Sequence, residues 1–126
     1  MDENNIKPSK RQEYKKFKRN AVLTEADIKK FRSMNTWFVR RLLNLREKYF
    51  ADALLRKYLG MFDPIHFGEF ELIQDLVHEE AMLFRMERMM KGNDHPPHVL
   101  MDTICRLTRR IDDLKSRLGV YPREVN

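Results

Sequence analysis

The stretch that decides the fold is LMDTICRLTRRIDDLKSRL, residues 100–118. Its apolar residues recur at spacings of 4, 3, 4, 3 and 4, which is the heptad period of a helix that packs along one seam. The seam consists of Leu100, Ile104, Leu107, Ile111, Leu114 and Leu118. Either an antiparallel hairpin with the preceding helix or assembly with other subunits buries such a seam, so we expect these six residues to form the hairpin or an oligomer interface.

The sequence before this stretch predicts the other half of a helical hairpin within residues 61–119. Apolar residues keep a helical period from Glu69 to Lys91, and Asp63-Pro64 is a predicted start because proline suits the first turn of a helix. The connector GNDHPPH, residues 92–98, stops one helix and begins the next. Gly119 is expected to end the last helix, with residues 120–126 as a tail.

Residues 24–60 also carry a helical pattern. Thr24 is placed to cap the backbone N–H of Asp27, and Gly60 is a predicted left-handed stop. A single helix of this length is unusual in a small domain. The polar residues at 33, 35 and 36 are candidates for a break, so residues 24–60 are expected to form either one long helix or two shorter helices.

The composition favours an all-α protein. The chain of 126 residues holds 4 Gly and 5 Pro, too few for the turns of an all-β fold. One cysteine excludes an internal disulfide and fits a reducing compartment. The chain has neither an apolar signal core at its start nor a long apolar stretch, so we expect a cytoplasmic protein without a membrane span.

Positive charge is concentrated at the front of the chain. Over residues 1–60, Lys and Arg outnumber Asp and Glu by 16 to 7, whereas residues 61–95 hold 3 basic and 8 acidic residues. Residues 1–23 lack an apolar period and are expected to form a basic, flexible arm, in which Tyr14 and Phe17 lie among lysines. A basic front half favours DNA as a partner. The expected phosphate contacts are Lys10, Arg11, Lys15, Lys16, Lys18, Arg19, Lys29 and Lys30.

Signatures of catalysis are missing from the sequence. It has no glycine-rich phosphate loop and no nucleophile elbow, so an enzyme is not expected. Cys105 is interpreted as a small packing residue, and the four methionines at 82, 86, 89 and 90 as adaptable core filling or a partner groove. Asp75 and His78 lack the second acid–histidine motif of a di-iron bundle, so no metal and no cofactor are expected.

The second half of the chain resembles the small subunit of tailed-phage terminases. The resemblance covers roughly residues 60–126 and rests on DPIHFGEFELIQDLVHEEAMLFRMERMM, residues 63–90, a proline-marked linker, and the ending Leu-Gly-Val-Tyr-Pro-Arg at residues 118–123. It implies a non-catalytic protein that assembles into a ring, recognises viral double-stranded DNA and recruits the terminase large subunit in the infected bacterial host.

We therefore expect an all-α fold of long helices with a C-terminal antiparallel helical hairpin and a basic flexible arm, acting as a DNA-binding adaptor. The alternative is a helical virion connector, or an inhibitor that docks on a protein and does not bind DNA. A transcriptional regulator would need a helix-turn-helix, for which Leu59-Gly60-Met61 is the one candidate turn.

Overall fold

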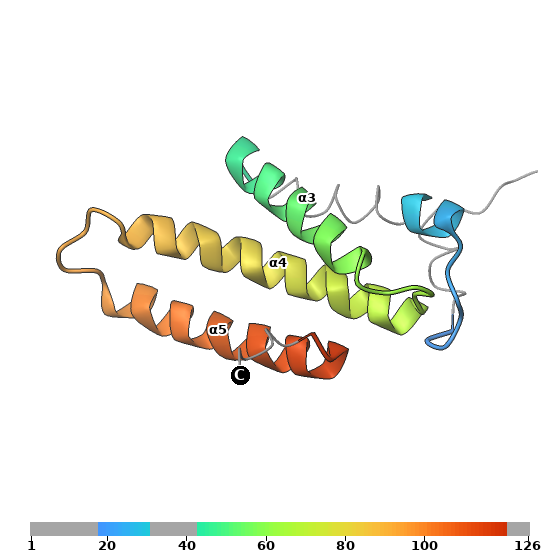
Figure 1. Ribbon diagram of the computed structural model, residues 1–126. Helices are drawn as coiled ribbons and strands as arrows, with labels where there is room; N and C mark the ends of the chain where they lie inside the picture. Colours follow the sequence, from blue (N-terminus) through green and yellow to red (C-terminus); the bar gives the residue numbers. More distant parts are fainter. Residues whose placement is uncertain (1–17, 31–42, 121–126) are drawn as a thin grey trace, which may run out of the picture.

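The computed structural model describes residues 18–30 and 43–120, and in these ranges the regular structure is helical (Figure 1). Residues 25–30 are helical and are followed by α3 (Leu45–Leu59), α4 (Phe67–Met90) and α5 (His98–Leu118). Figure 1 shows α4 between α3 and α5, with α5 returning along α4 as an antiparallel hairpin. The expected all-α class and C-terminal hairpin are confirmed. Predictions about residues 1–17, 31–42 and 121–126 lie outside the described residues.

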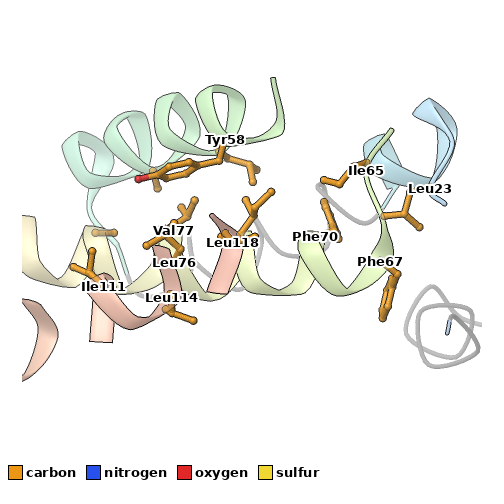
Figure 2. Close-up of a cluster of buried hydrophobic side chains, with 14 of the residues drawn as sticks. Leu23, Tyr58, Ile65, Phe67, Phe70, Leu76, Val77, Ile111, Leu114 and Leu118 are labelled. Atoms are coloured by element: carbon orange, nitrogen blue, oxygen red, sulfur yellow. The ribbon is translucent and has the colours of Figure 1, made fainter. Parts of the chain in front are cut away.

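The seam of α5 is buried against α4 within the same chain. Five of its six residues are buried and Ile104 is half-buried. Figure 2 shows Ile111, Leu114 and Leu118 among apolar residues of the core. Burying one such side chain contributes about 1.5–3 kcal/mol. Of the two ways of burying this seam, the hairpin is therefore the one that the chain adopts, and an oligomer contact has to use another surface unless the hairpin opens.

Gly119 ends α5 in the predicted way. Its φ is 73°, in the left-handed region that glycine adopts without steric cost, and its N–H bonds the carbonyls of Lys115 and Ser116. Gly60 behaves differently, because its φ of −69° is right-handed. The predicted left-handed stop at Gly60 is therefore wrong. The chain instead continues through a turn, in which Met61 N–H bonds Tyr58 O at 3.1 Å.

The start of α4 also differs from the prediction. The helix begins at Phe67, three residues after Pro64, and the Asp63–Pro64 peptide bond is cis. The first free N–H groups of a helix need acceptors. Here Phe67 N–H bonds Ala21 O at 2.8 Å and Gly68 N–H bonds Arg19 O at 2.9 Å. A segment more than 40 residues earlier in the sequence thus accepts the first N–H bonds of α4, while the N-cap residue His66 donates its own N–H to the Glu69 carboxylate at 2.9 Å.

This pairing moves the boundary of the predicted basic arm. Leu23 is buried, its N–H bonds Ile65 O at 2.9 Å, and Val22 forms an isolated antiparallel bridge with His66. Residues 18–23, which the sequence assigned to a flexible arm, therefore belong to the folded body, because they satisfy the backbone at the start of α4.

Residues 24–60 do not form one helix. The predicted cap at residue 24 is confirmed, since Asp27 N–H donates to Thr24 Oγ1 at 3.1 Å and Thr24 N–H donates to the Asp27 carboxylate at 3.1 Å. A new helix, however, begins at Leu45, behind the extended residue Asn44. The Asn44 side chain accepts the backbone N–H of Glu47 at 2.9 Å, and the Glu47 carboxylate accepts the backbone N–H of Asn44 at 3.1 Å, a reciprocal capping box.

Candidate nucleic-acid interface

An ion pair between a buried carboxylate and a partly exposed arginine anchors α3 to α4. Glu47 is 2% exposed, and its carboxylate accepts hydrogen bonds from Arg85 Nε at 3.1–3.2 Å and from Arg85 Nη2 at 2.6 Å. The hydrogen bonds from Arg85 lower the pKa of Glu47, against the opposing effect of burial. The ion pair therefore fixes the N-terminal half of α3 and removes the negative charge of Glu47 from the surface.

A second polar contact fixes the other half of α3. Tyr58 Oη donates to Glu80 of α4 at 2.5 Å, and Lys115 Nζ of α5 lies 3.7 Å from the same carboxylate. Desolvation, followed by the bond to Glu80, raises the pKa of the Tyr58 hydroxyl, which therefore stays protonated at neutral pH. Between the two polar contacts, the rings of Phe50 and Phe84 stack with centroids 4.4 Å apart. Together these contacts set the rotation of α3 on α4, and so decide which side chains point outward.

The surface that results is the α3 outer face, defined here as the exposed residues of this helix. Its members are Leu45, Arg46, Tyr49, Ala53, Arg56 and Lys57. Tyr49 is 70% exposed and Leu45 is 67% exposed. The residues recur at the spacings of one side of a helix, opposite the buried Glu47, Ala51, Leu55 and Tyr58.

All the formal charges on the α3 outer face are positive. The two acidic residues of α3 are Glu47, which is buried against Arg85, and Asp52, which is half-buried and has a partner of its own. Arg46, Arg56 and Lys57 surround an exposed tyrosine. Nucleic-acid surfaces commonly combine cations with an exposed aromatic ring in this way.

The exposed side of α5 differs, because it mixes both signs. Its exposed charged residues are Asp102, Arg106, Arg109, Arg110, Asp112, Asp113 and Arg117. Arg117 pairs with Asp113 at 3.2 Å, and Arg110 pairs with Glu79 of α4 at 3.3 Å. Such pairs keep a helix solvated and contribute little to a field of one sign.

None of the eight phosphate contacts predicted from the sequence belongs to the α3 outer face. Lys10, Arg11, Lys15 and Lys16 lie outside the described residues. Lys18 and Arg19 are exposed beside the start of α4, Lys29 is exposed, and Lys30 is half-buried with a partner. Arg46 and Arg56 were not among the phosphate contacts expected from the sequence. The signal that could have found them is the 3, 4, 3 spacing of Arg46, Tyr49, Ala53 and Arg56.

The remaining candidates from the sequence are Cys105, the four methionines and the possible metal ligands. Cys105 is exposed, so its interpretation as a packing residue is wrong: it lies one position beyond the seam residue Ile104, on the solvent side of α5. Met89 is 58% exposed, and Met82, Met86 and Met90 are half-buried. Within residues 18–30 and 43–120, no three His, Cys, Asp or Glu side chains gather as metal ligands. No described helix combines the length and apolarity that crossing a membrane requires.

Comparison of the chain with protein-family models, with curated proteins and with solved structures gives no match.

Proposed function

We propose that this chain is a non-catalytic DNA-binding adaptor of phage genome packaging. The observation that carries DNA binding is the α3 outer face, which exposes three cations and a tyrosine with no exposed acid beside them on the helix. The resemblance of residues 60–126 to terminase small subunits supports the packaging role, the assembly into a ring and the recruitment of a large subunit. Lys18, Arg19 and Lys29 would extend the phosphate contacts of α3.

If the cations of α3 contact DNA phosphates, the affinity for DNA should depend on salt and on the arginines. Lys and Arg side chains that contact phosphates release counterions, so DNA affinity falls steeply with salt. Arginine also offers two parallel N–H donors to one phosphate, a geometry that lysine lacks. Arg46 and Arg56 should therefore contribute most of the affinity of the face.

The test compares two double variants with equal changes in charge. Arg46→Ala/Arg56→Ala removes two arginines from the α3 outer face, and Arg106→Ala/Arg109→Ala removes two exposed arginines from α5. Fluorescence anisotropy with a labelled duplex should show a loss of about tenfold for the α3 variant, and a salt slope smaller by about 2. The α5 variant should bind nearly as the wild type does.

Equal losses of DNA affinity in the two variants would mean that net charge alone binds DNA, and would contradict a specific role for α3. A wild-type affinity that is unchanged between about 50 and 200 mM salt would remove DNA binding itself. Circular dichroism melts show whether each variant is still folded.

The second candidate is a helical protein-docking or connector protein without DNA binding. It is favoured by apolar side chains exposed around the connector end of the hairpin, where Met89 is 58%, Val99 is 76% and Met101 is 46% exposed. Light scattering of the wild type with and without duplex separates the two candidates: the adaptor forms an oligomer that gains mass with DNA, whereas the docking protein ignores DNA at low salt.

A further inference from the structure

The α3 outer face has two charged edges and an uncharged centre. Arg46 and Lys57 are eleven residues apart, about three helical turns, and so lie along one edge. Arg56 is rotated from Arg46 by about 80° around the helix axis and lies along the other edge. Tyr49 and Ala53 fall between the edges, and the exposed Leu45 lies about 20° outside the Arg56 edge, in the first turn of α3. Cations therefore flank a strip that carries one aromatic ring and one methyl group.

The dimensions of this face match a groove between two phosphate backbones. A helix with its side chains is about 10–12 Å wide, and the major groove of B-form DNA is about 12 Å wide. A helix of this length extends over about 22 Å. Ala53 adds little bulk at the centre of the face, so the helix backbone can come close to the floor of a groove.

Other nucleic acids fit the face less well. Single strands bind proteins through several stacked aromatic rings, whereas Tyr49 is the one exposed aromatic residue of α3. The major groove of A-form RNA is deep and narrow, and side chains do not reach its bases. The single ring, the small central residue and the two charged edges together favour a B-form duplex.

We infer that α3 enters the major groove of double-stranded DNA, with Arg46, Arg56 and Lys57 on the two phosphate backbones and Tyr49 and Ala53 toward the base edges. This inference rests on the proposed DNA binding and adds its mode. Tyr49, through its hydroxyl and its ring, is then the residue that reads the base edges, while the cations fix the position of the helix.

The experiment blocks the centre of the face without changing charge. Ala53→Leu adds bulk where the helix meets the groove floor, and leucine keeps the helix propensity of the site. Ser116→Leu makes a comparable change on the exposed side of α5 and serves as the control. The probes are a mixed-sequence DNA duplex of about 20 base pairs, roughly two helical turns, its separated single strand, and the RNA duplex of the same sequence.

We expect Ala53→Leu to weaken binding to the DNA duplex about tenfold, equal to about 1.4 kcal/mol, and to leave the salt slope unchanged, whereas Ser116→Leu has no effect. The wild type should prefer the DNA duplex to both other probes and protect guanine N7, a major-groove atom, from methylation by dimethyl sulfate. Tyr49→Phe should reduce discrimination between duplex sequences more than it reduces affinity.

Failure of this inference is distinguishable from failure of the proposed function. If Arg46→Ala/Arg56→Ala weakens binding while Ala53→Leu does not, or if the RNA duplex binds as tightly as DNA, α3 touches phosphates without entering the groove, and the inference is overturned. If the wild type binds none of the three probes, both proposals are overturned.

Discussion

Helices α3 and α5 pack on the same helix, α4, through different chemistry, and they expose different kinds of surface. The inner side of α5 is a regular apolar seam, and its outer side mixes both signs of charge. The inner side of α3 uses an ion pair with a buried carboxylate, a tyrosine–carboxylate bond and an aromatic stack. Because this packing buries Glu47, the charge left on the outer side of α3 is positive.

This difference shows that one helix can mainly stabilise the fold while its neighbour also presents a binding surface. An apolar seam leaves the charges of the outer side to pair among themselves, as Arg117 does with Asp113. A buried acid removes a negative charge from the surface, so the fully exposed charges of α3 are all of one sign.

Glu47→Ala should break the attachment of α3. It leaves the Arg85 guanidinium, which is one-third exposed, without its carboxylate, and it removes the acceptor of the Asn44 N–H. Because the Arg85 side chain stays partly solvated, we expect a loss of about 3 kcal/mol in the free energy of unfolding, from the charged hydrogen bonds and the capping bond together, measured by urea denaturation. A loss below about 1 kcal/mol, the range of exposed pairs, would show that the ion pair does not hold α3.

Leu114→Ala should weaken the seam of α5 by about 3 kcal/mol, because it removes a buried side chain and leaves a cavity. If the seam packs only within the chain, this variant keeps the oligomeric state of the wild type in light scattering. A change of mass without a loss of stability would instead make the seam an interface between subunits.

Tyr58→Phe removes the hydroxyl that donates to Glu80 but keeps the ring. Since Glu80 retains Lys115 nearby, we expect a moderate loss of about 1–2 kcal/mol in chemical denaturation. An unchanged stability would mean that the aromatic ring alone carries this contact between α3 and α4.

The pH dependence of stability should distinguish the contribution of the Glu47 charge from that of the size and packing of its side chain. Its pKa in the folded chain lies below the ordinary value of 4.5, so its contribution is complete above that value and is lost as the pH falls through the lower, folded pKa. The wild type should therefore lose more stability than Glu47→Gln between about pH 5 and pH 3. Parallel pH profiles of the two proteins would contradict the lowered pKa.

Arg117→Ala should have the smallest effect, at most about 0.5 kcal/mol, because Arg117 and Asp113 are both about 60% exposed. Thermal melts followed by circular dichroism are sufficient to check it. A loss of stability larger than about 1 kcal/mol would show that ion pairs on the outer side of α5 stabilise the fold. The two helices would then differ less than proposed.

Local patterns made the hairpin predictable. The spacing from Leu100 to Leu118 identified a helix with one apolar side, and Gly119 identified its end, because both signals act within a few residues of the chain. The starts of α4 and α3 were not predicted correctly. At the start of α4, Glu69 accepts the N–H of His66 locally, whereas the N–H groups of residues 67 and 68 bond carbonyls of residues 21 and 19, and no local pattern encodes that distant pairing.

Local patterns in the sequence are sufficient to predict the helical class, the antiparallel hairpin and the excess of positive charge in the first half of the chain. Which of these charges remain at the surface depends on tertiary packing. Arg85 is 38 residues from Glu47 in the sequence, and their contact holds the carboxylate that follows Arg46 in α3 away from the surface. The period of a helix fixes which residues share a side, whereas packing against α4 fixes which side of α3 faces solvent.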